Sequence, residues 1–131
     1  ARSHAPDEPW RYRSPSLPIF DANLKSLAAK ARAECVLAHV RGVAYSTAVQ
    51  VSEQNTHPFR FPGAAVAMAH NGDIYRIGEM KRALVEHIKP ELVAQIAGST
   101  DSEWVYALLL SQLPDWRAEP DGDTLVAAVQ A

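Results

Sequence analysis

Apolar positions near the start of the chain predict one amphipathic helix after an irregular arm. Four prolines within residues 1–18 prevent a regular helix, so this stretch is expected to be an arm that packs on something else. From Phe20 to Ala31, apolar residues recur at helical spacing, with Asp21 as the cap and basic side chains on the other side. We therefore expect a helix of about three turns there.

Two short apolar runs predict strands that are buried on both faces. The first covers residues 35–40, and the second covers residues 64–69 and stops abruptly before Asn71 and Gly72. Continuous apolar runs of this length are typical of buried strands. The polar residues 42–54 between the two runs are expected to form a loop, with a short extended piece at residues 47–51.

Helical periodicity returns in the second half of the chain. Thr100 and Glu103 form a capping box ahead of an apolar series that ends at Leu113. Pro90 is placed to open a shorter helix, and residues 114–122 read as a linker. The expected helices span residues 78–87, 90–96, 100–113 and 124–131. Because the helices follow the strands and do not alternate with them, the pattern favours an α+β fold over a doubly wound sheet.

Composition narrows the class of protein. The chain has 131 residues, enough for one domain, and its formal net charge of −2 comes without any stripe of Lys or Arg. We therefore expect no nucleic-acid or anionic-membrane partner. No apolar run has the ~18 residues of a membrane span. The single cysteine, Cys35, excludes a disulfide within the chain and favours the cytoplasm.

Four polar sites stand at the ends of expected buried elements, where folds present side chains to ligands. Arg41 ends the first strand, where a guanidinium can bind a carboxylate or close the strand as a solvated charge. Asp101 lies in the first turn of a helix, where it can receive an ammonium group or act only as a cap. Asn71 and Gly72 form a hairpin turn or an oxyanion hole, and His57 is held extended by the proline that follows.

Taken together, these candidates describe more specific chemistry than any of them alone. A carboxylate binder, an ammonium binder and an oxyanion hole are the parts of a pocket for an α-amino acid whose side-chain carbonyl is attacked. His39 and His70 flank the two expected strands and could share a metal. No third ligand has suitable spacing, so hydrogen-bonded histidines are expected, and no metal or organic cofactor is implied.

The residues resemble a known family through four motifs in order. The motifs are A-H-V-R at residues 38–41, N-T-H-P-F at 55–59, H-N-G at 70–72 and S-T-D-S-E at 99–103. This series is similar to that of the class II glutamine amidotransferases, N-terminal-nucleophile hydrolases that release ammonia from glutamine. The resemblance runs from about Pro15 to Leu113 and is nearest to the short stand-alone proteins of this type.

The resemblance implies a fold and roles for the four sites. The fold would be a four-layer αββα sandwich, present as a fragment without its first strands. Residues 1–131 would be one partial amidotransferase domain: an arm at 1–18, a motif-bearing core at 19–113, and a linker and helix start at 114–131. By resemblance, Arg41 holds the glutamine α-carboxylate, Asp101 the α-amino group, Asn71 and Gly72 the oxyanion, and His57 lines the pocket.

Two departures from the family pattern are visible. The family's nucleophile is an N-terminal cysteine whose own amine is the base, a role that Ala1 cannot fill. Cys35 falls in an expected buried strand and is no substitute, so we expect a segment carrying the nucleophile to precede Ala1, and the chain alone to be unstable. After Arg41, residues 42–45 also depart from the pattern, which bears on substrate binding.

The sequence leaves three functions open. The first is a glutaminase or amidotransferase domain that converts glutamine to glutamate and ammonia. The second is a hydrolase of another γ-glutamyl amide that uses the same pocket. The third is a regulatory module that binds an amino acid without turnover. The expected partners are glutamine or a γ-glutamyl amide, and a second copy of the chain in a homodimer.

Overall fold

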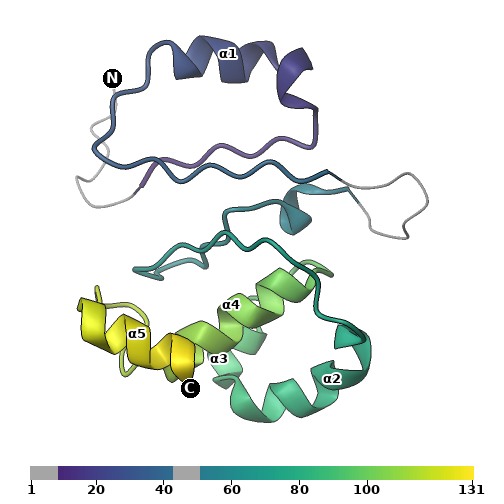
Figure 1. The fold of residues 1–131 in the computed structure, drawn as a ribbon, viewed down its shortest axis with the longest axis vertical. Coiled ribbons are helices and arrows are strands. Elements are labelled where there is room, and N and C mark those ends of the chain that lie inside the picture. Colours follow the sequence, from purple (N-terminus) through teal and green to yellow (C-terminus); the bar gives the residue numbers. More distant parts are fainter. Residues whose placement is uncertain (1–8, 43–50) are drawn as a thin grey trace.

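The structure is a computed structural model that describes residues 9–42 and 51–131 (Figure 1). Its elements are the 3-10 helices η1 (Pro18–Phe20), η2 (Glu53–Asn55) and η3 (Val85–His87), and the α-helices α1 (Ala22–Ala28), α2 (Ile77–Leu84), α3 (Pro90–Val93), α4 (Asp101–Gln112) and α5 (Gly122–Gln130). Most of the extended piece expected at residues 47–51 lies outside the described residues. None of the helices in the described ranges combines the length and the apolar character that a bilayer crossing requires.

The predicted α+β fold, an αββα sandwich, is wrong for the part of the chain that is described. Those residues contain no strand, and their one β-bridge is an antiparallel pair between Phe59 and Met68. Segments 9–17 and 33–42 run side by side in the upper half of Figure 1. No backbone hydrogen bond joins these two described segments. Because a strand is defined by its hydrogen-bonded neighbour, the apolar pattern produced extended backbone but no sheet.

The first apolar run is also not buried. Val36 is 76% exposed and Val40 is 71% exposed. Cys35 is exposed as well, which corrects the expectation that it is a core residue. Periodicity identified a segment able to enter a sheet, but burial depends on tertiary partners that this pattern does not encode.

Helix α1 is held by its cap and by the N-terminal arm. The Asp21 carboxylate accepts a hydrogen bond from the Leu24 N–H at 2.9 Å, as expected for an N-cap. The Tyr12 hydroxyl contacts both Asp21 oxygens, at 2.9 and 2.8 Å. These bonds lower the pKa of Asp21, with the backbone N–H of Leu24 as the largest cause. The helix ends at Ala28, three residues before the predicted Ala31, and buries none of its residues.

Helix α4 begins at the predicted capping box, but the box is used in a different way. Thr100 is the N-cap, and its hydroxyl accepts from the Glu103 N–H at 3.4 Å. The Glu103 carboxylate accepts from the N–H groups of Ala97 at 3.0 Å and Gly98 at 2.7 Å. The buried Glu103 therefore fastens the turn that enters α4 and does not reach back to the cap residue.

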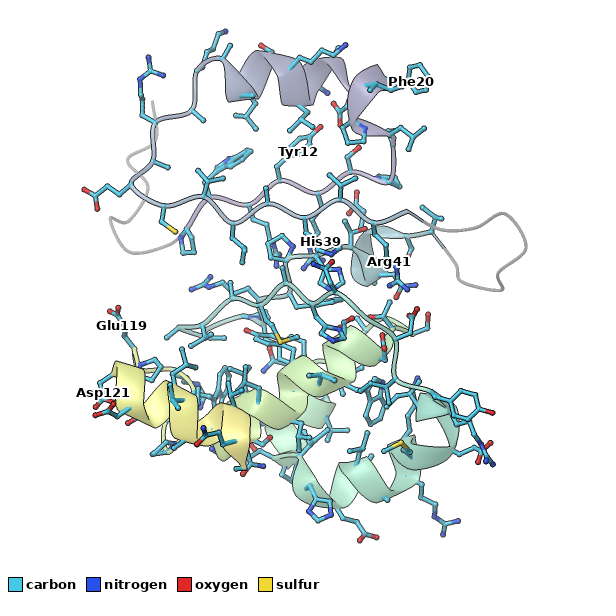
Figure 2. All side chains as sticks on the ribbon, viewed as in Figure 1. Tyr12, Phe20, His39, Arg41, Glu119 and Asp121 are labelled. Atoms are coloured by element: carbon cyan, nitrogen blue, oxygen red, sulfur yellow. The ribbon has the colours of Figure 1, made fainter. Side chains whose placement is uncertain are left out.

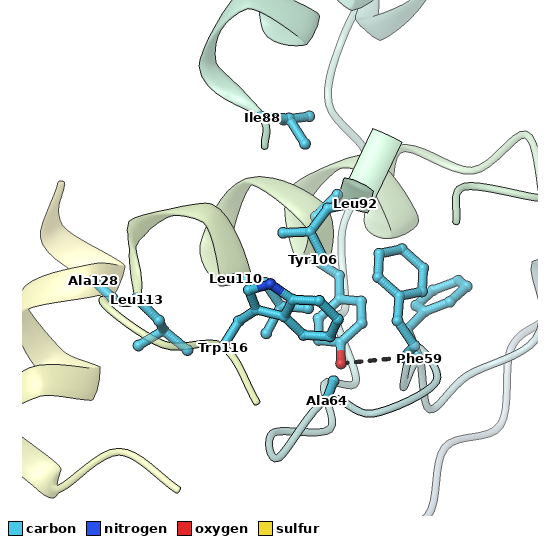
Figure 3. Packing of buried hydrophobic residues seen from close by; sticks show 11 residues of the cluster. Phe59, Ala64, Ile88, Leu92, Tyr106, Leu110, Leu113, Trp116 and Ala128 are labelled. Carbon is cyan, nitrogen blue, oxygen red and sulfur yellow. Dashed lines mark hydrogen bonds between the residues drawn. The ribbon is translucent and has the colours of Figure 1, made fainter. Parts of the chain in front are cut away.

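The apolar core is built from residues between Phe59 and Ala128 and is centred on α4 (Figure 3). Tyr106 is fully buried there, and its hydroxyl donates to the Val66 carbonyl at 2.6 Å and accepts from the Phe61 N–H at 3.4 Å. Burial raises the pKa of Tyr106 to about 12, so this donor stays protonated. The segment that leads to the Asn-Gly turn is thus fixed to α4 by a side chain. The buried hydrophobic residues are Phe59, Phe61, Ala64, Ile88, Leu92, Tyr106, Ala107, Leu110, Leu113, Trp116 and Ala128.

Candidate active site

One cavity of about 220 Å³ brings together most of the polar sites that the motifs predicted. It lies between the end of the first extended segment and the Asn-Gly turn. Figure 2 labels His39 and Arg41, which come from that extended segment. Four of the five predicted residues line it, whereas Asp101 does not. The lining residues are His39, Val40, Arg41, Gly42, His57, His70, Asn71, Gly72, Asp73 and Ser102.

The Asn71 side chain is held from across the cavity. Its Oδ1 lies 2.9 Å from Nε2 of His39, although the two residues are 32 positions apart. An amide oxygen can only accept a hydrogen bond, so with this orientation of the amide the contact requires the His39 hydrogen on Nε2. The amide nitrogen of Asn71, with its two N–H donors, is the group that remains for the cavity.

Gly72 occupies a backbone conformation that favours glycine. Its φ is 141°, which side-chain-bearing residues rarely adopt. The ring of His70 lies beside this glycine, and a Cβ added here would be in van der Waals contact with it, 3.4 Å from Nε2. The turn therefore needs glycine at this position, and glycine leaves its own N–H uncovered by a side chain.

A chain of hydrogen bonds supports the turn from the start of α4. Nδ1 of His70 lies 3.0 Å from the hydroxyl of Ser102, which is buried. The Ser102 hydroxyl in turn lies 3.3 Å from Oδ1 of Asp101. The ring that borders Gly72 is thus connected through one serine to the carboxylate of Asp101, the first residue of α4.

Asp101 itself is buried behind this serine. Its Oδ2 accepts from the Ile74 N–H at 2.6 Å, and its Oδ1 accepts from the Ser102 N–H at 2.8 Å. These bonds fix the segment after the Asn-Gly turn to the first turn of α4. Together with the Ser102 hydroxyl, they use about three of the roughly four acceptor positions of a carboxylate.

Arg41 reaches the cavity beside an acidic residue. Its guanidinium Nη2 lies 3.6 Å from Oδ1 of Asp73, and the Arg41 side chain is 27% exposed against 86% for Asp73. Within the described residues, the partly desolvated Arg41 cation therefore has one weakly held, exposed carboxylate partner. Such a cation can exchange a surface carboxylate for that of a ligand, because exposed ion pairs contribute about 0–1 kcal/mol.

His57 is the most buried of the three histidines around the cavity. It is 3% exposed, and neither ring nitrogen has a hydrogen-bond partner among the described residues. Burial, with smaller contributions from nearby His39 and Arg41, lowers its pKa to about 4, so the ring is neutral at pH 7. Its ring packs against His39 with centroids 4.2 Å apart and against the edge of Phe59 at 4.6 Å.

The three imidazoles do not form a metal centre in the described part of the chain. No group of three or more His, Cys, Asp or Glu side chains there has an arrangement that could hold an ion. Arg41 supplies a guanidinium and Asp73 a carboxylate to the cavity lining, and the histidine and asparagine side chains add further hydrogen-bonding groups. The site therefore suits a small polar ligand whose anionic group can bind Arg41 in place of Asp73.

Sequence reasoning missed three contacts at this site. Ser102 lines the cavity, whereas the sequence singles out only its neighbour Asp101. His39 is hydrogen-bonded, as expected, but the sequence does not identify Asn71 as its partner; its position in the A-H-V-R motif is the available signal. Asp73 pairs with Arg41, and its position next to the Asn-Gly turn is the available signal.

The comparisons with known proteins agree with the motifs. The sequence profile of the class-II glutamine amidotransferases matches residues 17–131. The chain therefore belongs to the class II glutamine amidotransferase family, which confirms the family that the motifs indicated.

A relative in Saccharomyces cerevisiae is described as the probable glutamine amidotransferase DUG3. It is 38% identical to this chain over 120 residues, which is 89% of this chain and 32% of the relative. The chain thus spans about a third of the yeast protein's length. No solved structure gives a significant match.

Proposed function

We propose that the protein carrying this chain hydrolyses the side-chain amide of glutamine to glutamate and ammonia. The main support for this proposal is that Arg41, Asn71 and Gly72 line one cavity in a chain of this family. A volume of about 220 Å³ is below the ~300–1,000 Å³ of typical drug-sized sites and suits a single amino acid.

Each part of the cavity has a role in this proposal. Arg41 binds the α-carboxylate of glutamine in place of Asp73. Asn71 Nδ2 and the Gly72 N–H donate to the oxygen of the reacting carbonyl, where negative charge develops in the transition state. Neutral His57 forms the buried wall and adds no second positive charge beside Arg41.

The nucleophile of the proposed reaction is a cysteine from elsewhere in the full-length protein. Cys35 is the only cysteine in the sequence, and it is not among the residues that line the cavity. A thiolate would attack the amide carbon, and the tetrahedral intermediate would expel the nitrogen as ammonia after protonation. Water would then hydrolyse the γ-glutamyl thioester, which releases glutamate and restores the thiol.

In this proposal, the Asp101 carboxylate accepts a hydrogen bond from the α-amino group of glutamine at a position next to Ser102. Its carboxylate already accepts hydrogen bonds from Ile74 and Ser102, so one acceptor position remains for an ammonium group. The same bonds give Asp101 a structural role, so its replacement would affect both binding and the shape of the turn.

The test is ammonia release from L-glutamine by the full-length protein, with L-asparagine as the shorter control and γ-glutamyl p-nitroanilide as the competing substrate. Preference for glutamine supports the proposal. Preference for the anilide points to another γ-glutamyl amide. Glutamine binding by calorimetry without ammonia release points to a regulatory module and overturns the catalytic proposal.

Site variants tie that activity to this cavity. Arg41→Ala should raise KM for glutamine with a smaller effect on kcat, because a carboxylate contact is present in both ground and transition states. Arg82→Ala is the matched control, since Arg82 is exposed on α2 and does not line the cavity. Equal KM values for the two variants would remove Arg41 from the site.

A further inference from the structure

The contact between His39 and Asn71 determines which face Asn71 shows to the cavity. The carbonyl and amino halves of an asparagine amide differ little in shape, and rotation about χ2 by half a turn exchanges them. Only the amino half can donate to an oxyanion, whereas the carbonyl half would repel it. Something must therefore select one orientation if Asn71 is to stabilise negative charge.

His39 is placed to make that selection. Its Nε2 lies 2.9 Å from Oδ1 of Asn71 and lines the same cavity. If the ring hydrogen is on Nε2, the bond holds the amide oxygen and leaves Nδ2 for a ligand. If the hydrogen were on Nδ1, Nε2 would be an acceptor and the amide would turn its oxygen to the cavity. The tautomer of His39 therefore determines the orientation of the Asn71 amide.

The position of His39 is itself fixed from the core. Its ring packs against His57, which in turn meets the edge of Phe59. Phe59 is 1% exposed and exchanges two backbone hydrogen bonds with Met68, of 2.8 and 3.0 Å. Met68 lies three residues before Asn71, so both partners of the contact are anchored to the same backbone pair.

We propose that His39 is a positioning residue that holds the amide of Asn71 with its N–H donors toward the cavity. This inference rests on the proposed function, in which those donors bind the oxyanion. His39 touches no reacting atom in this scheme. It acts only through the side chain that it orients.

The kinetic test compares two substitutions in the full-length protein. His39→Phe keeps a ring to pack against His57 but removes the donor, whereas His39→Gln keeps an N–H donor at similar reach. His39→Phe should lower kcat for glutamine about ten-fold while KM stays within about two-fold, the loss expected for one hydrogen bond. His39→Gln should recover most of that kcat.

A matched control at an exposed histidine, His87, and three contrary results complete this test. His87 is exposed in η3 and does not line the cavity, so His87→Phe should leave kcat unchanged. An unchanged kcat in His39→Phe, a rise in KM alone, or no recovery in His39→Gln would each overturn the positioning role.

A second readout separates this inference from the proposed function. In ¹⁵N-histidine-labelled protein, the neutral His39 ring should carry its hydrogen on Nε2, and the Nε2 resonance should move in Asn71→Ala. A predominant Nδ1–H form would overturn the inference even if glutamine is hydrolysed. If glutamine is not hydrolysed, an Nε2–H ring coupled to Asn71 would uphold the contact while the proposed function fails.

Discussion

The guanidinium of Arg41 and the carboxylate of Asp73 lie 3.6 Å apart at the edge of the cavity. Asp73 directly follows the Asn-Gly turn, so the residue that neutralises Arg41 belongs to the segment that carries the oxyanion donors. A ligand carboxylate that binds Arg41 has to displace this exposed partner. Asp73 is therefore expected to weaken substrate binding.

Replacing Asp73 tests this competition. Asp73→Asn should lower KM for glutamine by up to about five-fold at low salt, because exposed ion pairs contribute about 0.2–1 kcal/mol. The difference should shrink at high salt, since screening weakens the pair. Asp123→Asn, an exposed change in α5, should not alter KM. A higher KM in Asp73→Asn would show instead that Asp73 helps to bind the substrate.

Gly72 should not tolerate even one methyl group. Gly72→Ala would put a side chain on a residue with a φ of 141°, which side-chain-bearing residues rarely adopt, so the backbone of the turn would be strained. We expect a loss of about 1–3 kcal/mol in the free energy of unfolding, with a fall in kcat as the Gly72 N–H moves. Urea denaturation and glutamine turnover measure the two effects.

The matched glycine control is in α2. At Gly78 an added Cβ would meet nothing within 4 Å, and the residue is helical. Gly78→Ala should therefore be neutral or should stabilise the protein by about 0.4–1 kcal/mol. Equal behaviour of the two alanine variants would contradict the strain assigned to Gly72.

His57 makes stability depend on pH in a defined direction. Its pKa is about 4 in the folded protein, against about 6.5 in an unfolded chain, so the unfolded state binds more protons between these values. The stabilisation is therefore complete above pH 6.5 and is lost as the pH falls toward 4. Between pH 7 and pH 5, it should decrease by on the order of 1–2 kcal/mol.

A variant without this titrating group should show a flatter profile. His57→Phe removes the ionisable ring, so its free energy of unfolding should change less than that of the wild type between pH 7 and pH 5. His87→Phe is the matched control, because it makes the same substitution at an exposed site away from the cavity. Parallel profiles for wild type and His57→Phe would exclude the buried neutral imidazole.

Asp101 should show both a structural and a binding effect. Asp101→Asn would bring an amide N–H against the N–H of Ile74 or Ser102, since both oxygens now accept from backbone. An unsatisfied buried donor costs about 1–3 kcal/mol, so stability should fall without any ligand, and KM should rise as the charge is lost. Unchanged stability would contradict the buried position of the carboxylate.

Local sequence signals predicted where two helices begin, because a single capping side chain largely determines the start of a helix. Asp21 and Thr100 cap helices where the sequence placed caps, because capping depends on a few adjacent residues. The strand predictions failed because a strand needs a hydrogen-bonded neighbour far away in the sequence. Val36 and Val40 carry the apolar pattern of a strand, yet they remain exposed in extended backbone.

The candidate site was likewise predicted only in part: the sequence identified its residues but not the contacts among them. The motifs named Arg41, His57, Asn71 and Gly72, and these residues lie around one cavity. The contacts among them could not be derived, because the bond from His39 to Asn71 spans 32 positions and depends on how the extended segment packs. Periodicity likewise predicted that Asp101 lies in the first turn of a helix. It did not predict the contact between the Asp101 carboxylate and the Ser102 hydroxyl.

The most direct test of the central claim is kcat for glutamine in Asn71→Asp and Asn71→Ala, measured on the full-length protein. Alanine removes the donor and should lower kcat by about 10²-fold or more, with KM little changed. Aspartate replaces the donor with an anionic acceptor and should be at least as damaging. Asn23→Asp, an exposed change on α1, should keep the wild-type kcat. Wild-type kcat in either Asn71 variant would contradict an oxyanion hole at this turn.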